Sequence, residues 1–481
     1  MMRRLSCVFL LLICAGCLVS AQTPAGSGKQ GRVASDFMRE GQQLGACKSI
    51  SSFVDCAQTL VTGQPMHVAL GSLAPQNGFA AGVAFVEHKN CPTDPEKGSL
   101  CPKEFRFSWD VDAVATGNGS WRAGAYMKAF RLSTPKIVVS YGTPKKKTKP
   151  LFNVAPLFNL HAETNSLNHI DYYGLGASTL PSGKASYGMT ETIAGISGVF
   201  PTRFAGISLY GELNGRVPQI RGDHNESSPS IEQLYTDATA PGLASQPAYL
   251  QPGEALRIQP EIFAGHLRLH YLAEFQQYIA VGNAQGSFRR WTADLDHEIP
   301  LDHRVRLIVS DSHKGPDSCT SDPATPCPSP THVSSAMNHE GSIDLRLFMT
   351  GSVANAHSVV PFYFDPSIGG SDINGQPLLA SFPDYRFRAP NLIVLRETVE
   401  HAVPKLPLGV YFSADQGKVA MHRDDIDFSN LRKSYTAGLT VHAGGLPVVY
   451  LLFSWGGNEG NHTTFSVSNV LLGASARPSL F

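Results

Sequence analysis

From about residue 76 onward, apolar and polar residues alternate in short segments, as expected for β-strands with one apolar face. Two examples, SYGMTETIAGISGVF (186–200) and FAGISLYGELNGR (204–216), are separated by PTR. ALRIQPEIFAG (255–265) and LRLHYLAEFQQYIA (267–280) meet at His266, whereas 217–253 is long and polar. Short turns that alternate with long loops are typical of membrane barrels, in which the two ends differ in this way.

Counting these segments predicts an all-β fold, a transmembrane antiparallel β-barrel of about sixteen strands. We expect a turn at Asp302 between strands at 288–301 and 303–313, and another strand at 358–365. Chain ends on one side of the membrane require an even number of strands, so 118–164 supplies one strand; three there would give eighteen. The remaining predicted strands are 78–88, 104–114, 342–350, 391–401, 408–415, 435–443, 447–455 and 463–473.

The first residues, MMRRLSCVFLLLICAGCLVSAQ, have the pattern of a secretory signal peptide. Arg3 and Arg4 precede an apolar run that is too short to span a bilayer. Small residues then suit cleavage before Gln22, and the alternative is a lipid-modified Cys17 within CAGC. We therefore expect residues 1–21 to be a signal peptide that exports the chain across the inner membrane.

Residues 22–75 have little strand pattern and are predicted to form a short periplasmic leader ahead of a barrel at 76–481. SDFMREGQQL (35–44) has a serine capping signal and helical character, which favours one helix there. A disordered leader is the alternative. Beyond the signal no apolar run reaches about 18 residues, so the sequence offers no membrane-spanning helix.

Composition and charge add two constraints. The chain has 45 Gly, 25 Phe and 15 Tyr with 16% charged residues, which suits a barrel and equally a soluble enzyme. The 39 basic and 39 acidic residues give zero net charge, so no nucleic-acid partner is expected. The expected partners are outer-membrane lipid, the barrel-assembly machinery during biogenesis, and an unknown transported substrate.

The cysteines form close pairs once Cys7, Cys14 and Cys17 are removed with the signal. In an exported protein such pairs predict local disulfides, each worth about 2–3 kcal/mol in the chain-entropy account. Zinc is the alternative, but the intervening loops hold no nearby His pair, so no metal or cofactor is expected. The predicted disulfides are Cys47–Cys56, Cys91–Cys101 and Cys319–Cys327. With sixteen strands, the last two of these disulfides are expected at the outer end of the barrel, together with the stretch 366–390.

That stretch, PSIGGSDINGQPLLASFPDYRFRAP (366–390), interrupts the strand pattern. It begins with the pair Gly369–Gly370 and ends with an Arg-Phe-Arg. A strand NLIVLRETVEH (391–401) follows, and then VYFSADQGKV (410–419), which contains Asp415 and Gly417.

This order of features resembles the bacterial surface-antigen superfamily of outer-membrane barrels, which includes the barrel-assembly factor and two-partner secretion transporters. In that family a double glycine begins a long external loop, an Arg-Gly-Phe or Arg-Gly-Tyr tip folds back into the lumen, and a Glu-bearing strand and an F-x-D-x-G strand follow. IDYYGLG at 170–176 is similar to another recurrent family segment. The resemblance covers residues 76–481 and implies a location in the bacterial outer membrane.

The chain departs from the family at the loop tip. The tip falls on Leu379, Ala380, Ser381 and Phe382, so the family's Arg and Gly are absent. Arg386 or Arg388 is a candidate replacement, because a guanidinium in a polar lumen needs acidic partners. The alternative is that RFR merely begins the descending strand. The candidate partners are Glu397, Glu400 and Asp415, and strand parity points only one of the two glutamates inward.

Two further departures concern the ends of the chain. The family's periplasmic domains capture client chains, and the segment between Gln22 and the barrel is too short for one of them. Client insertion by that route is therefore not expected. At the other end, Phe481 is either the terminal aromatic of the assembly signal or part of a short tail.

Enzyme signatures are absent from the sequence, and no catalytic residue is predicted. No G-x-S-x-G, H-E-x-x-H or phosphate-binding glycine loop occurs. The 17 histidines, among them His161, His357, His401 and His442, are scattered over separate segments. KKKTK at 145–149 is interpreted as a solvated loop, with binding to anionic headgroups as the alternative.

These observations predict a porin-like transport pore or a membrane-remodelling barrel. In either, 366–390 folds inward as a constriction, and the seam between the first and last strands provides any lateral opening. The alternative is a structural, surface-exposed barrel with a plugged lumen and no transport. A barrel enzyme acting on lipids needs a Ser/His or Asp/His pair at one rim, which the sequence does not display.

Overall fold

The chain divides into two compact units, residues 1–56 and 57–481. A computed structural model of the protein describes Met38 and Gly41 in the first unit and most of 65–467 in the second. The gaps in the second unit are 91–104, 132–156, 203, 205, 224–227, 311–330, 357, 373–374, 376, 404–405 and 444–445. The predicted signal peptide, the predicted disulfides and KKKTK lie outside the described residues and stay predictions.

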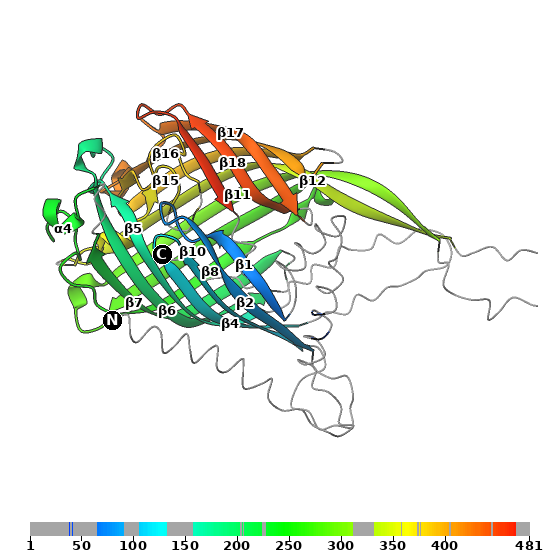
Figure 1. Ribbon diagram of the computed structural model, residues 1–481, viewed down its shortest axis with the longest axis horizontal. Coiled ribbons are helices and arrows are strands. Elements are labelled where there is room, and N and C mark those ends of the chain that lie inside the picture. The colour runs from blue at the N-terminus through cyan, green and yellow to red at the C-terminus, as the bar shows by residue number, and fades with distance from the viewer. Residues whose placement is uncertain are drawn as a thin grey trace, which may run out of the picture. The chain divides into compact units, whose positions relative to one another are not determined.

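The second unit is an antiparallel β-barrel (Figure 1). Its sheet has 17 strands, but the two-residue β9 only continues β8 along β10, so the barrel wall has sixteen. The first eight strands are β1 (Met66–Ser72), β2 (Phe79–Asn90), β3 (Phe105–Thr116), β4 (Trp121–Arg131), β5 (Leu157–Tyr172), β6 (Ala185–Pro201), β7 (Ile207–Gly222) and β8 (Tyr249–Ile258). After β9 (Glu261–Ile262) come β10 (Leu267–Ala280), β11 (Phe288–Ser310), β12 (Thr331–Ala354), β15 (Asn391–Ala402), β16 (Leu408–Ala420), β17 (Arg432–Ala443), β18 (Leu446–Trp455) and β19 (His462–Val467). The predicted fold class is therefore confirmed.

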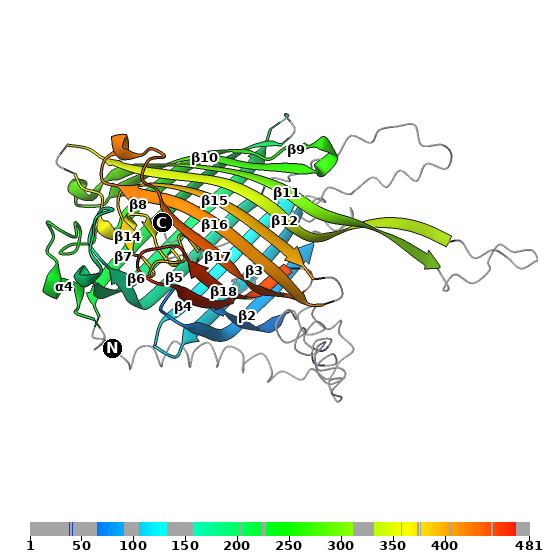
Figure 2. The ribbon, with the colours of Figure 1, turned by 90° about the horizontal axis from the view of Figure 1, so that it is seen from above.

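Each strand of the wall pairs with the next one along the chain, from β1–β2 to β18–β19. Among the described residues no ladder joins β1 to β19, so the barrel is nearly closed and has one seam between these two strands. The β11–β12 ladder reaches Ser310 opposite Thr331, whereas β15 stops pairing with β12 at Gly341. This hairpin therefore extends past its neighbours as a two-stranded ribbon (Figure 2).

Because the strands alternate in direction, their connections fall at two ends of the barrel. We call the end that carries 355–390 the plug end; α4 (Ile231–Leu234) lies in another connection there (Figure 2). The β2–β3 and β11–β12 connections, which hold four of the predicted disulfide cysteines, fall at the opposite end. The prediction that these two loops share an end with 366–390 is therefore wrong.

Two pairs of errors in the predicted strand list offset each other. The first strand, β1, begins at Met66, inside the range assigned to the leader, and 118–164 contributes to both β4 and β5. Conversely, no turn occurs at Asp302, because β11 runs through it with only a register shift after Leu301. The expected strand at 358–365 is instead a short 3-10 turn, η5 (Phe362–Phe364). The total of sixteen is right although these four assignments are not.

The outward face of the wall is apolar. Along β18, Leu451 and Phe453 are 50% and 47% exposed, whereas Leu452 and Ser454 between and beside them are buried. Phe204 and Phe263 are exposed in turns at the opposite end, where aromatic girdles meet the membrane surface. A face of this kind suits lipid rather than water, and an even-stranded antiparallel barrel that carries it is an outer-membrane protein. No helix in the described part of the chain is long and apolar enough to cross a membrane.

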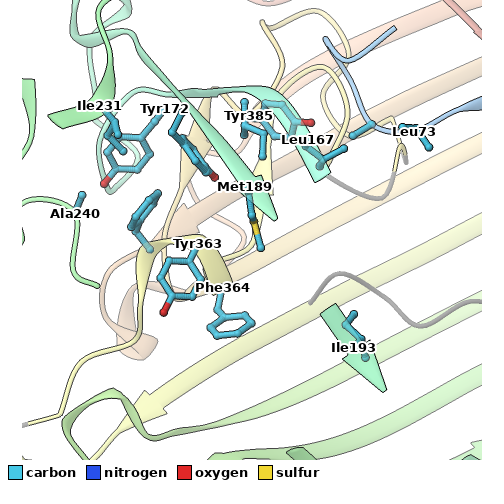
Figure 3. Close-up of a cluster of buried hydrophobic side chains, with 14 of the residues drawn as sticks. Leu73, Leu167, Tyr172, Met189, Ile193, Ile231, Ala240, Tyr363, Phe364 and Tyr385 are labelled. Carbon is cyan, nitrogen blue, oxygen red and sulfur yellow. The ribbon is translucent and has the colours of Figure 1, made fainter. Parts of the chain in front are cut away.

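The hydrophobic core lies inside the lumen at the plug end. Phe362, Tyr363 and Phe364 of η5 are fully buried. Tyr278 stacks on Phe288 with ring centroids 4.3 Å apart, and Phe364 contacts both rings. Figure 3 shows Tyr363 and Phe364 within this cluster of buried side chains. We call the following residues the aromatic plug: Tyr172, Tyr187, Tyr249, Tyr278, Phe288, Phe362, Tyr363 and Phe364.

Candidate functional site

The stretch 366–390 folds into the lumen beside the aromatic plug. Its ends pair as a small separate sheet, β13 (Ser367–Ile368) with β14 (Phe387–Arg388). Apolar residues of the stretch form a second buried cluster with side chains of β15 and β16. These are Ile368, Leu378, Leu379, Phe382, Phe387, Ala389, Leu392, Val394 and Val419. The stretch is therefore a packed element, which we call the in-folded loop.

The two glycines let the in-folded loop turn tightly. Gly369 and Gly370 have φ values of +114° and +61°, a region that favours glycine. A Cβ on Gly369 would lie 2.6 Å from Pro383 O and from Arg386 Cβ. The amide of Tyr385 donates to Gly369 O at 3.0 Å. The double glycine thus brings the two arms of the loop into contact.

The tip of the loop is tied to the barrel wall by backbone amides. Leu379 N donates to Asp415 Oδ2 on β16 at 3.0 Å, and Ser381 N donates to Ser434 Oγ on β17 at 2.9 Å. Leu379 has a φ of +54°, which is unusual for a branched residue. Ala380 and Phe382 are both 3% exposed. The tip is therefore held against β16 and β17 by two backbone amides, without an arginine in it.

Asp415 is also paired with Arg396 of β15. Arg396 Nε and Nη2 donate to Asp415 Oδ1 and Oδ2 at 2.7 and 3.2 Å, and both residues are buried. Sequence reasoning missed Arg396, although a signal exists. Strands 391–402 and 408–420 form a hairpin, and counting back from Ala402 opposite Gly409 puts Arg396 opposite Asp415. Gly417 lies further along β16, where an added Cβ would lie 2.9 Å from Ile393 O.

Arg386 lies inside the barrel but not against its predicted partners. It is 1% exposed; Nε donates to Glu459 Oε2 at 2.6 Å, and Nη1 donates to Thr179 Oγ1 at 2.8 Å. Its guanidinium stacks on Tyr173, 4.9 Å from the ring centroid. Glu459 and Thr179 lie in the β18–β19 and β5–β6 connections, which no sequence pattern places beside residue 386.

Arg388 is likewise buried, and its Nη1 donates to Phe362 O at 3.0 Å. Its carbonyl accepts from the amide of Gly176 at 2.7 Å, which ties the in-folded loop to the end of IDYYGLG. The predicted pairing of Arg386 or Arg388 with Glu397, Glu400 or Asp415 is therefore wrong. Glu397 is exposed, and Glu400 lies 3.3 Å from His442 Nε2.

Asp365 is buried where η5 meets the in-folded loop. It is fully buried, and neither carboxylate oxygen has a hydrogen-bond partner in the described part of the chain. Burial raises the pKa of Asp365 to about 8, although the nearby guanidiniums of Arg388 and Arg290 oppose this change. Arg290 instead donates to Phe364 O and to Ser352 Oγ.

A cavity of about 760 Å³ lies between the in-folded loop and the seam. Residues of the loop, such as Gly370 and Phe382, form one side, and β19 forms another. Ser72, at the end of β1, lines the cavity as well. The in-folded loop and the two strands of the seam, β1 and β19, therefore border one cavity.

The histidines are not gathered at this cavity. Of those named above, His161 is buried on β5, while His401 and His442 lie on β15 and β17; His357 lies outside the described residues. No group of three or more metal-binding side chains occurs among the described residues.

These features define the class of protein: an outer-membrane barrel with an in-folded loop and a seam. No family model matches the sequence, and no curated protein matches it. Solved structures similar to the chain include CdiB from Acinetobacter baumannii, at 14% identity and a TM-score of 0.43, covering 84% of this chain and 60% of that chain. BamA from Haemophilus ducreyi lacking POTRA domains 1–3 is 12% identical with a TM-score of 0.43, covering 84% of this chain and 69% of that chain. CdiB from Escherichia coli is 12% identical with a TM-score of 0.45, covering 84% of this chain and 62% of that chain. The chain thus spans about three fifths of both CdiB chains, and at these values the likeness gives no information on activity.

We expect Asp415→Ala to lower the free energy of unfolding by about 3–5 kcal/mol, because it leaves a buried guanidinium and the Leu379 amide unpaired. In the double variant Arg396→Met/Asp415→Leu, the free energy of unfolding should fall by less than the sum of the falls caused by Arg396→Met alone and Asp415→Leu alone. Guanidinium titration of the barrel in lipid vesicles measures both values. Asp294→Ala, which breaks the partly exposed Arg346–Asp294 pair, is the control and should cost about 1 kcal/mol or less. Equal losses for Asp415→Ala and the control would contradict this assignment.

We expect Asp365→Asn to flatten the dependence of stability on pH. A carboxyl group whose folded pKa is raised from 3.8 to about 8 stabilises the fold fully below pH 3.8 and loses that contribution as pH rises through about 8. The slope is at most about 1.4 kcal/mol per pH unit. Unfolding titrations at pH 5 and pH 8 should show that the free energy of unfolding of Asp365→Asn, relative to that of wild type, is higher at pH 8 than at pH 5. The exposed Asp237→Asn is the control, and parallel curves for wild type and Asp365→Asn would refute the prediction.

Proposed function

We propose that the protein is a membrane-remodelling barrel of the surface-antigen superfamily that acts through its β1–β19 seam rather than through an open axial pore. One observation carries this proposal. The plug end is filled by the aromatic plug and the in-folded loop, whereas β1 and β19 share no ladder among the described residues and border a cavity. The role is non-enzymatic, and the barrel-assembly machinery is the expected partner during biogenesis.

The chain's own contacts support the placement in the superfamily. The resemblance implies a loop tip that folds back into the lumen, and Leu379 N donates to Asp415 of the F-x-D-x-G strand. It also singles out IDYYGLG, whose Gly176 bonds to Arg388. Thus three separated segments that resemble the family meet in one interior site.

The seam can separate at low cost. Every other neighbouring pair of strands in the wall shares a ladder of backbone hydrogen bonds, and each bond adds about 0.5–1.5 kcal/mol to stability. Within the described residues 65–467, no such ladder opposes separation of β1 from β19. An opening there would expose the cavity sideways to lipid, which disturbs the bilayer next to the barrel.

Hydrogen–deuterium exchange in lipid nanodiscs tests the seam. We expect amides of β1 and β19 to exchange faster than those of β8 and β10, which pair on both sides. The control pair β8 and β10 belongs to the same wall, so slow penetration of solvent affects both pairs equally. Equal protection of the two pairs would rule out a seam that opens.

A transport pore is the second candidate, because the in-folded loop is one continuous segment whose movement would widen the lumen. We expect low single-channel conductance from the wild-type barrel and a rise on deletion of residues 371–389. Shortening the 421–431 connection, which is exposed at the same end, is the matched control and should leave conductance unchanged. No change on deletion of 371–389 would remove the constriction role and favour the structural barrel with a plugged lumen.

A further inference from the structure

The cavity beside the seam has two chemically different sides. Phe79 and Phe465 are 48% and 64% exposed, and Phe465 lies on the lipid-facing side of β19. On the inner side, Arg396, Tyr411 and Tyr450 face the lumen from β15, β16 and β18. The cavity therefore joins the lumen to the apolar outer face at the only neighbouring strands in the described wall that lack a ladder.

The inner side presents hydrogen-bond donors that no protein acceptor uses. Arg396 donates hydrogen bonds from Nε and Nη2 to Asp415, while its Nη1 makes no hydrogen bond within the described part of the chain. The hydroxyls of Tyr411 and Tyr450 make none there either, and their rings meet edge to face at 6.2 Å. His462 Nε2 is buried with no partner among the described residues.

Such a donor set suits an oxyanion. A guanidinium with a free N–H and hydroxyls that can rotate toward one point form strong, charge-assisted hydrogen bonds with phosphate. Asp384 is the acidic residue that lines the cavity, and its Oδ1 accepts from the amide of Ser371 at 3.0 Å. Three further acidic residues lie near the donors: Asp415 and Asp372 interact electrostatically with Arg396, and Glu400 with Tyr450. Burial also raises the pKa of Asp384 to about 6, which reduces its repulsion of an anion at lower pH.

We propose that this cavity binds a phosphate-bearing membrane lipid, with the phosphate on the Arg396, Tyr411 and Tyr450 side and an acyl chain over Phe79 and Phe465. The volume of about 760 Å³ lies within the range of small-molecule pockets and accommodates a headgroup with part of one chain. The inference rests on the proposed function, since the seam is the route by which a lipid would reach this cavity. It adds a substrate class: the barrel takes lipid molecules in at its side.

Photo-crosslinking from inside the lumen tests this site. The full-length barrel carries p-benzoylphenylalanine at Tyr450 and is placed in phosphatidylcholine vesicles that contain radiolabelled phosphatidylglycerol. Asn159, which is also buried on the lumen side but on β5, is the control position. We expect a lipid adduct at position 450 and none at 159. Equal adducts at both positions would mean that lipid fills the lumen without a site, and would overturn the proposal.

The headgroup contacts are tested by variants that keep the packing. In the p-benzoylphenylalanine-450 background, Tyr411→Phe with His462→Gln should reduce the phosphatidylglycerol adduct about tenfold, equivalent to about 1.4 kcal/mol. The adduct with labelled diacylglycerol, which lacks phosphate, should be weak and unaffected by these variants. If excess inorganic phosphate abolishes the lipid adduct, the site belongs to free phosphate and the lipid assignment fails.

The two proposals fail separately. No adduct at position 450, together with fast exchange of β1 and β19, would overturn the lipid site and leave the seam intact. Slow exchange of β1 and β19 would instead remove the seam, whatever lipid is found. Folding of each variant is checked by its heat-dependent migration on gels, so that a loss of adduct reports on binding.

Discussion

The carboxylate of Asp415 is the contact on which the arrangement of the interior depends. It is 1% exposed and accepts hydrogen bonds from both Arg396 on the neighbouring strand and the amide of Leu379 at the loop tip. A buried carboxylate is stable only with such partners. Because one of them is a backbone N–H, the loop tip is held there whatever side chains it carries. This explains how Ala380 and Ser381 can occupy the tip while the loop stays folded inward.

The plug end combines this polar anchor with an apolar filling. The aromatic plug packs rings from five wall strands around η5, and the second apolar cluster packs the in-folded loop on β15 and β16. Arg386 and Arg388 are buried between them, with carbonyl, hydroxyl and carboxylate partners. Apolar packing and the Asp415 contacts therefore act together to hold the in-folded loop inside the plug end.

The fold class followed from the sequence because alternation with period two is a local property. The same pattern does not fix the ends of individual strands. A turn is expected at Asp302, yet β11 only shifts register there. SVVPFYFD has the composition of a strand, but its rings fill the lumen. β1 has only seven residues, Met66–Ser72, and the predicted leader at 22–75 includes them all.

Gly369 and Gly370, which the sequence singles out, have positive φ at the start of the in-folded loop, whereas the partners of its arginines differ from the expected ones. Arg396 could be found by counting hairpin register from the 403–407 turn. Glu459 and Thr179 could not, because they come from connections whose positions depend on closure of the whole barrel.

The order of the ladders in the described wall also bears on how the barrel forms. Every ladder in the described wall joins strands that follow each other around it, so each pairing closes only the connection between two consecutive strands, even where that connection is as long as 355–390. Pairing β1 with β19 would instead join segments at opposite ends of the sheet, and the entropy cost of that closure grows with the length of chain between them. Folding dominated by local contacts is fast. The sheet can therefore grow as a curved ribbon in chain order, before its first and last strands are brought together.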